Sequence, residues 1–301
     1  IEEVREARTV ASRIRNSLQP SFALGGQEVT SSASIGIALS SGGYGRPEDL
    51  IRDADTAMYS AKAEGRARIS LFDRSMHEDA VARLKLENDL SQALTEQQFV
   101  LQYQPIISLE TGSITGFEAL LRWQHPERGL LLPGDFIEVA EETGLIEEVG
   151  WWVLEEAATA AAKWRTDHPD FESLQLNVNL SSKQFRRADL ASSVVDLLGR
   201  VGLPPARLRL EITETVVMED AQASREVLAE LQGQGVGICI DDFGTGYSSL
   251  NYLHAFDVDV LKIDRSFVRR ISREHCPEII GTILELSRSM GLKVTAEGVE
   301  S

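Results

Sequence analysis

Beyond residue 98, apolar and polar residues alternate in seven short segments, and stretches with helical spacing separate the later ones. The expected strands are 99–108, 114–122, 174–180, 207–213, 236–241, 258–263 and 292–297. Strands that alternate with helices predict an α/β fold built on a parallel sheet. Only a short turn around 111–113 joins the first two strands, and a parallel crossover needs a dozen or more residues. We therefore expect a modified (β/α)8 barrel of the TIM type with one antiparallel strand, whose last βα unit is absent from this chain.

The first 97 residues follow a different pattern. Residues 1–72 predict a helix, a β-rich stretch at 29–39, a second helix at 47–65 and a short strand at 69–72. This is too little material for a well-buried core, so we expect part of an α/β domain. Residues 73–97 predict a charged helical connector with an apolar stripe, formed by Leu84, Leu86, Leu90 and Leu94. We favour simple packing of this helix over a signalling role, because most amphipathic helices pack. Residues 98–301 form the predicted barrel domain.

The composition limits which kinds of ligand and which compartment we expect for this chain. Hydrophobic residues make up 43% and charged residues 26%, which is ordinary for a globular domain, and no apolar run reaches membrane-spanning length. The two cysteines have no disulfide or metal spacing, so we expect a cytoplasmic chain, whose parent protein could be tethered to a membrane by sequence outside it. The net charge of −17 argues against binding a nucleic acid polymer. It is compatible with a small phosphate ligand if cations reverse the local charge.

Acidic and amide residues recur at the carboxyl ends of the predicted strands, where barrel enzymes place their chemistry. They are Glu118, Asn179, Glu211, Asp241, Asp242 and Glu297. Any one of them alone would be read as a helix cap or a turn residue. Their joint occurrence at the same end of five strands instead predicts one shared site. Asn177 alternates with Asn179 and is expected to face the same side.

The donor types indicate which cation would hold these carboxylates together. Oxygen ligands suit Mg²⁺ or Mn²⁺, and Ca²⁺ is compatible, whereas clustered His and Cys residues that would favour zinc are missing from the sequence. Adjacent Asp241 and Asp242 suggest a two-metal site, which suits in-line attack on a phosphodiester. Lys262 ends another strand; we prefer a role in binding phosphate or orienting water over a plain salt bridge to Asp264 or another acid. The glycine-containing loop 241–250 is expected to act as a lid.

Several motifs resemble those of the EAL family of cyclic di-GMP phosphodiesterases. In chain order they are EALLRW (118–123), NVNLS (177–181), EITE (211–214), DDFGTG (241–246), KID (262–264) and EGVE (297–300). The resemblance covers about residues 80–301. The family fold is a modified β/α barrel with one antiparallel strand, in agreement with the pattern of strands above.

The resemblance implies hydrolysis of one phosphodiester of cyclic di-GMP to linear pGpG with two Mg²⁺ or Mn²⁺ ions, Ca²⁺ being inhibitory. Family motifs give the residue roles as follows: Glu118, Asn179, Glu211 and Asp241 hold one ion; Asp241, Asp242 and Glu297 hold the second; Lys262 assists the attacking water; Gln104, Arg122, Asp242 and Lys262 contact the substrate; Glu214 anchors the glycine-rich loop; Glu300 lies near the site. The catalytic group would then comprise Lys262, Glu118 and Asp241. The family also implies a homodimer.

Residues 29–39, 53–62 and 65–66 resemble the C-terminal half of a GGDEF, or diguanylate cyclase, domain. Lys62 and Arg66 match positions that contact nucleotide phosphate there, while the Gly-Gly-Asp-Glu-Phe signature does not occur in the sequence. Two alternatives stay open for the barrel. One is a catalytically inactive cyclic di-GMP receptor. The other is a glycosidase with two carboxylates, which does not explain Asn179, the aspartate pair and Lys262 together.

Overall fold

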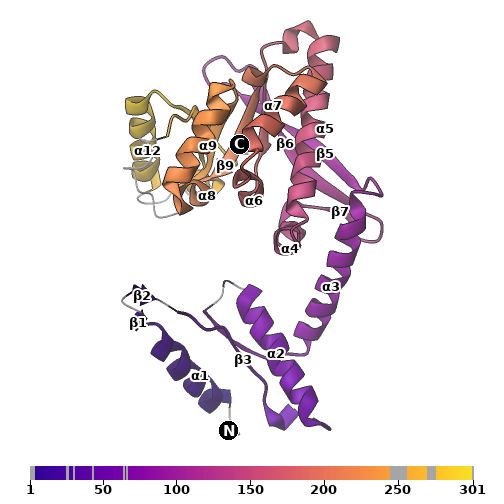
Figure 1. Ribbon diagram of the computed structural model, residues 1–301, viewed down its shortest axis with the longest axis vertical. Helices are drawn as coiled ribbons and strands as arrows, with labels where there is room; N and C mark the ends of the chain where they lie inside the picture. The colour runs from indigo at the N-terminus through magenta and orange to yellow at the C-terminus, as the bar shows by residue number, and fades with distance from the viewer. Residues whose placement is uncertain are drawn as a thin grey trace. The chain divides into compact units, whose positions relative to one another are not determined.

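The computed structural model in Figure 1 describes residues 4–24, 27–29, 31–42, 44–63, 65, 67–244, 256–269 and 276–299. The chain divides into two compact units, residues 1–89 and residues 90–301, which are described separately below. Within the described residues, no helix combines the length and the apolar character needed to cross a membrane.

The N-terminal unit follows the predicted order of elements, with one addition. It contains α1 (Val4–Leu18), β1 (Phe22–Leu24), β2 (Gln27–Val29), β3 (Ile35–Ile37), η1 (Ser40–Gly42), α2 (Pro47–Ala63), β4 (Ile69–Leu71) and most of α3 (Ser75–Ala93). Strands β3 and β4 pair in parallel, as a helical crossover between them requires. Strands β1 and β2 form an antiparallel hairpin that the sequence pattern did not predict, because each strand has only three residues.

A small apolar core holds this unit together. Ala7 and Ala11 of α1 are buried against Ile37 of β3. On the other side, α2 approaches β3 so closely that a Cβ on Gly36 would lie 2.0 Å from the Ala54 carbonyl oxygen. Only glycine allows this separation between helix and strand.

Helix α3 connects the two units. The side chain of Asp73 accepts a hydrogen bond from the Ser75 backbone N–H at 3.0 Å at the start of the helix. Near its C-terminal end, Leu86, Leu90 and Ala93 are buried at spacings of four and three residues. The prediction that Leu84 belongs to this stripe was wrong, since its side chain is 60% exposed. In a helix of 3.6 residues per turn, residues that are two positions apart point to nearly opposite sides, so Leu84 and Leu86 cannot share one face.

The C-terminal unit is built on a curled sheet. Its strands are β5 (Phe99–Ile107), β6 (Ile114–His125), β7 (Gly129–Leu131), β8 (Gln175–Asn179), β9 (Leu208–Thr213), β10 (Gly237–Phe243), β11 (Val260–Ile263) and β12 (Lys293–Ala296). Their order is β12-β11-β10-β9-β8-β6-β5, with β7 on β6. The predicted antiparallel pairing of β5 with β6 is confirmed, and β6 and β8 to β12 pair in parallel. Strand β7, three residues long, was not predicted.

Helices cover the outer face of this sheet (Figure 1). The described helices of this unit are α4 (Ile137–Thr143), α5 (Ile146–Asp167), α6 (Ser182–Phe185), α7 (Leu190–Val201), α8 (Glu214–Glu219), α9 (Ala221–Gly233), α11 (Arg265–Val268) and α12 (Cys276–Met290), with short 3-10 turns η2 (Pro133–Asp135), η3 (Pro169–Phe171) and η4 (Pro205–Arg207). Among the described strands, β5 and β12 end the sheet without pairing to each other. The predicted barrel-type fold with one reversed strand is confirmed. In the described residues its sheet is a curled half-barrel that does not close.

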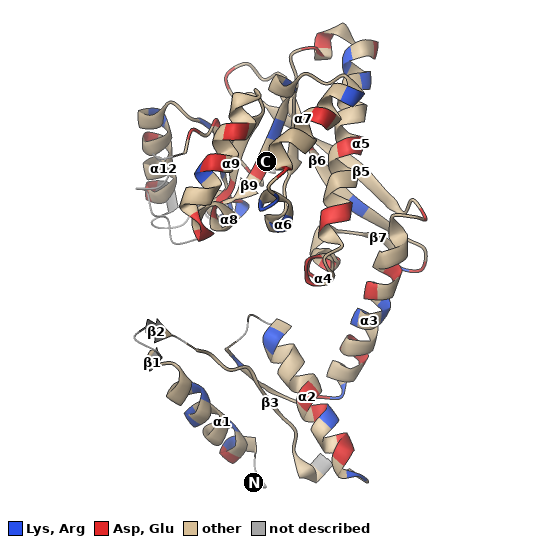
Figure 2. Ribbon diagram, viewed as in Figure 1, with Lys and Arg blue, Asp and Glu red and all other residues tan. Residues whose placement is uncertain are grey.

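Charged residues gather on the helices and turns, and the strands carry few of them (Figure 2). Because a strand in this sheet is covered by helices on one face, a charged side chain within it must point to the concave inner face or lose its hydration. The acidic residues of the predicted site are therefore exceptions to the general distribution of charge.

Candidate active site

The ammonium group of Lys262 lies at the centre of four carboxylates. Its Nζ is 2.5 Å from Glu297 Oε1, 2.6 Å from Glu211 Oε2, 3.2 Å from Glu118 Oε2 and 3.3 Å from Asp241 Oδ2. These side chains come from β6, β9, β10, β11 and the residue after β12. The structure thus brings together groups up to 179 positions apart, as the strand-end pattern predicted.

Strand register explains the convergence. Asn179 is the pairing partner of Glu211, and Glu118 is the partner of Asn177. Paired residues in neighbouring strands face the same side of a sheet, so these side chains all point to the concave face. There the Asn179 amide donates to Glu118 Oε1 at 2.9 Å. Below it, the Asn177 amide donates to Glu211 Oε1 at 2.6 Å.

The centre of the cluster is buried, whereas its rim is partly exposed to solvent. Lys262 is 2% exposed and Glu211 is 1% exposed, whereas the Glu297 side chain is 29% exposed. Burial raises the pKa of Glu211 to about 8 against the attraction of Lys262. Burial works against the charge on Lys262, but the carboxylates of Glu211, Glu118, Asp241 and Glu297 outweigh it and raise the lysine pKa above its usual range. Lys262 is therefore a cation at neutral pH when these carboxylates surround it.

The aspartate pair lies at the end of β10. The Asp242 backbone N–H donates to Asp241 Oδ1 at 2.9 Å, and Asp242 adopts a left-handed φ of 54°. This conformation is costly for a residue other than glycine and is typically kept at functional sites. Burial, followed by the charges of Asp241 and Asp264, raises the pKa of Asp242. Asp264 itself caps α11 through the Ser266 backbone N–H rather than pairing with Lys262 in a described contact.

Glu214 connects the site to the start of the predicted lid. It is buried at the first position of α8, and its Oε2 accepts a hydrogen bond from the Gly244 backbone N–H at 3.1 Å. Gly244 has a φ of 93°, which favours glycine. Within the described residues, Glu214 Oε1 is buried and has no hydrogen-bond partner. Residues 245–250 of the predicted lid, together with Arg66 and Glu300, lie outside the described residues.

The two predicted substrate-contacting residues lie on the hairpin of β5 and β6. Gln104 is the direct cross-strand partner of Glu118 and therefore faces the same side. Arg122 lies four residues beyond Glu118, and its Nε donates to Gln102 Oε1 at 2.8 Å. In the N-terminal unit, Lys62 is exposed with its ammonium 5.1 Å from the centre of the Tyr59 ring.

The donor chemistry of the cluster fits divalent metal ions. Four carboxylates and one ammonium carry a formal charge of −3 when all are ionised (−4 + 1), and oxygen donors suit Mg²⁺ or Mn²⁺. As they stand, no three Asp, Glu, His or Cys side chains of the described ranges are spaced to share an ion. In this arrangement the carboxylates converge on the lysine ammonium.

Sequence reasoning assigned no role to three neighbours of this cluster. Asn177 was recognised only as sharing a face with Asn179. Cys239 is the strand partner of Glu211 and is fully buried, and burial raises the pKa of its thiol. Gln102 holds Arg122. Period-two alternation within the strands places Asn177 and Gln102 on the inner face and is the signal that points to them.

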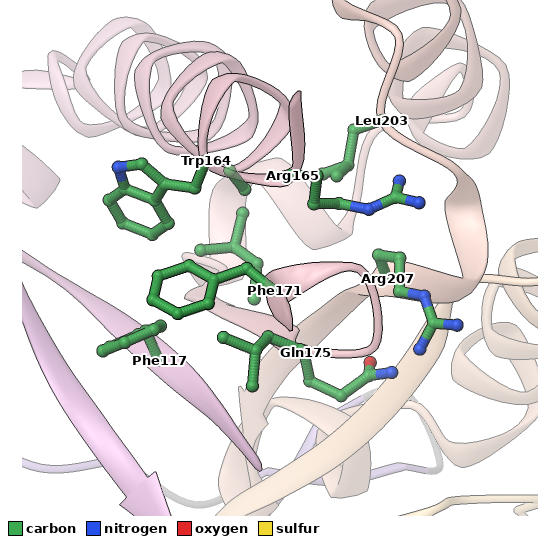
Figure 3. A pocket seen from close by; sticks show the side chains of 10 residues that line it. Phe117, Trp164, Arg165, Phe171, Gln175, Leu203 and Arg207 are labelled. Carbon is green, nitrogen blue, oxygen red and sulfur yellow. The ribbon is translucent and has the colours of Figure 1, made fainter. Parts of the chain in front are cut away.

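A separate small pocket, with a volume of about 10 Å³, is lined by aromatic and basic residues (Figure 3). Phe117, Trp164 and Phe171 form one side, while Arg165 and Arg207 lie on the other. The ring centroids of Phe117 and Trp164 are 5.5 Å apart, and Arg207 donates to the Ser173 carbonyl at 2.9 Å. The lining includes Gln175 at the amino end of β8, so this pocket lies away from the carboxylate cluster.

The sequence and the fold both match known proteins. Residues 87–301 match the EAL domain, and residues 1–68 match the diguanylate cyclase GGDEF domain. The chain is 44% identical over 301 residues to the bifunctional diguanylate cyclase/cyclic di-GMP phosphodiesterase MucR of Pseudomonas aeruginosa, covering 99% of this chain and 44% of that protein. The chain therefore spans less than half the length of this curated relative.

Two solved structures extend the comparison. The MucR phosphodiesterase in complex with c-di-GMP has a TM-score of 0.70 and 46% identity, covering 72% of this chain and 87% of that one. The EAL enzyme Bd1971, bound to cAMP and cyclic di-GMP, has a TM-score of 0.70 and 35% identity, covering 74% and 61%. From these matches, the motifs and the curled sheet with one reversed strand, it follows that the chain belongs to the EAL domain family and begins with a segment of the GGDEF type.

Proposed function

We propose that this chain is a metal-dependent phosphodiesterase that hydrolyses cyclic di-GMP to linear pGpG in a bacterial signalling protein. The observation that carries the proposal is the surplus of negative charge around Lys262, where four inward-facing carboxylates meet a single ammonium. Such a cluster is costly unless cations compensate it, and a phosphodiesterase needs cations beside its anionic substrate. The relatives that bind or hydrolyse cyclic di-GMP support the choice of substrate.

We assign the residues by their match to the motifs of the EAL family. One ion would be held by Glu118, Asn179, Glu211 and Asp241, and a second by Asp241, Asp242 and Glu297. Bound Mg²⁺ or Mn²⁺ would neutralise these carboxylates, withdraw charge from the phosphate oxygens and favour ionisation of an attacking water. We expect Ca²⁺ to inhibit, because its longer and more variable oxygen coordination changes the placement of the ligands.

Lys262 acts as a cation in this scheme. In the metal-free protein the four carboxylates raise its pKa, so it is protonated at neutral pH and donates hydrogen bonds. Once the carboxylates are engaged by metal, the ammonium is free to orient the water or to stabilise charge on the phosphate. Gln104 and Arg122 lie on the adjacent hairpin, where they would contact the substrate.

The reaction adds water across one phosphodiester. The water oxygen attacks phosphorus, the bond from phosphorus to the 3′ oxygen breaks, and that oxygen leaves with a proton to give pGpG with a 5′ phosphate. Glu214 would contribute by holding Gly244, which begins the glycine-rich segment next to the site. A buried carboxylate that accepts a backbone N–H fixes the start of this segment.

We propose a partial GGDEF domain at 1–72, a connector at 73–97 and an EAL domain at 98–301, together with a homodimer as the assembled form. Sedimentation equilibrium would test the proposed dimer. A measured mass equal to that of the monomer at micromolar concentration would exclude it.

The activity is tested by incubating cyclic di-GMP with this chain, and with a version extended at its C-terminus, in Mn²⁺ with and without EDTA. We expect metal-dependent pGpG, lost in Glu118→Ala and kept in Glu110→Ala, which removes an exposed carboxylate from the turn between β5 and β6. Product formation in EDTA would refute the metal-dependent mechanism. Tight binding of cyclic di-GMP without any product from either version would instead establish a receptor.

A further inference from the structure

Asn177 is a buried polar residue that the proposed ligand set does not include. It is 2% exposed, lies in the middle of β8 and points to the concave face of the sheet. Buried amides keep their hydrogen-bonding groups satisfied, so its partners identify what the side chain does.

The NH₂ group of the Asn177 amide donates a hydrogen bond to Glu211. Nδ2 of Asn177 lies 2.6 Å from Glu211 Oε1, while the other oxygen, Oε2, lies 2.6 Å from Lys262 Nζ. The two oxygens of this carboxylate therefore have different environments. The amide holds the inner oxygen, and the outer oxygen faces the cluster in which the other three carboxylates meet.

Arg209 gives the amide its orientation. Arg209 is the strand partner of Asn177, and its Nη1 lies 3.5 Å from Asn177 Oδ1. A guanidinium can only donate hydrogen bonds, so it selects the amide rotamer whose oxygen faces Arg209 and whose NH₂ faces Glu211. Arg209, Asn177 and Glu211 thus form a directed chain across β8 and β9.

We propose that Asn177 is a positioning residue that sets the affinity of the carboxylate cluster for divalent metal ions. By fixing the inner oxygen of Glu211, the amide orients the carboxylate, so that its outer oxygen can exchange the Lys262 ammonium for a metal ion with less cost for ordering the side chain. This inference rests on the proposed phosphodiesterase function, because it assumes that Glu211 is a metal ligand.

The test is direct binding of Mn²⁺, measured by calorimetry on the full chain without substrate. Asn177→Ala and Asn177→Asp both remove the donor, and the aspartate variant also keeps the size of the side chain. We expect each to weaken Mn²⁺ binding about 10- to 100-fold, the range found for groups that orient metal ligands. At saturating Mn²⁺, the KM for cyclic di-GMP should change less than about threefold, since Asn177 contacts Glu211 and not the substrate.

Gln175→Ala is the matched control. Gln175 precedes Asn177 by two residues on the same face of β8, and its amide donates to the Ala206 carbonyl at 3.1 Å, away from the cluster. This variant removes an exposed amide hydrogen bond from the same strand and should bind Mn²⁺ like the unaltered chain. A loss of affinity equal to that of the Asn177 variants would assign the effect to general weakening of β8 and overturn the proposal.

Folding is followed by circular dichroism, so that a misfolded variant is recognised. If neither variant folds, Asn177→Ser replaces them; its hydroxyl is too short to reach Glu211, and the same loss of affinity is expected. Folded variants that bind Mn²⁺ within twofold of the unaltered chain would overturn the inference while leaving the proposed function intact. An unaltered chain that binds no Mn²⁺ would overturn the proposed function itself.

Discussion

Replacing Lys262 by methionine tests whether the ammonium holds the carboxylate cluster together. The substitution keeps an unbranched side chain but leaves four inward-facing carboxylates without the cation that each contacts at 2.5 to 3.3 Å. Removing one partner from a buried ion pair costs about 3–5 kcal/mol. We expect a loss of this size in the free energy of unfolding of the metal-free chain at pH 7.

The loss should depend on pH with a definite sign. The pKa of Glu211 is already raised in the folded state, and removing Lys262 raises it further because the lysine charge lowers it. A group whose pKa is raised on folding stabilises the protein below its unfolded pKa and loses that contribution as pH rises through the folded value. Glu211 is protonated in the folded state of both proteins below about pH 8, so its part of the Lys262→Met deficit should be small up to pH 7 and grow as pH rises above 8.

Urea unfolding followed by tryptophan fluorescence measures this effect. The signal reports on the C-terminal unit, residues 90–301, because this unit contains all four tryptophans of the chain: Trp123, Trp151, Trp152 and Trp164. Mn²⁺ at about 100 times its Kd should restore about 2.7 kcal/mol, since the ion supplies the missing positive charge to the folded state only. Lys163→Met, on the exposed face of α5, is the control. A deficit that stays constant from pH 7 to about pH 9.5 and is unaffected by Mn²⁺ would refute the reasoning.

Three further predictions concern other parts of the chain. Mn²⁺ affinity measured by calorimetry should rise between pH 6 and pH 8, because Glu211 must lose its proton to bind metal and its pKa is raised to about 8; an affinity independent of pH would contradict this. Glu214→Ala should lower kcat about tenfold or more with little change in Mn²⁺ affinity, since it removes a charge-assisted hydrogen bond to Gly244; equal loss of metal binding would place Glu214 among the ligands. Gly36→Ala should destabilise residues 1–89 by about 1–3 kcal/mol or more, seen as faster hydrogen exchange in α2, whereas Gly45→Ala, whose added Cβ meets nothing within 4 Å, should have no such effect.

The reversed strand shows that local sequence pattern can predict the relative direction of two strands. The turn between β5 and β6 is so short that chain connectivity alone requires antiparallel pairing, and the structure confirms it. The apolar stripe of α3 shows the limit. Four leucines suggested a stripe that included Leu84, yet the buried face runs through Leu86, Leu90 and Ala93. Hydrophobicity alone does not show which of two apolar helix positions is covered, because the covering groups come from elsewhere in the chain.

The sequence by itself determined the element order, the reversed strand and the set of residues at the strand ends, because these depend on period-two and helical spacing and on the lengths of connections. Only the tertiary structure decided how those residues meet. Register across parallel strands placed the Glu211 carboxylate between the Asn177 amide and the Lys262 ammonium, groups 34 and 51 positions away along the chain. Such contacts are set by the shear and curl of the sheet, which no single segment encodes. The charge state of Glu211 likewise follows from burial, a property of the folded chain.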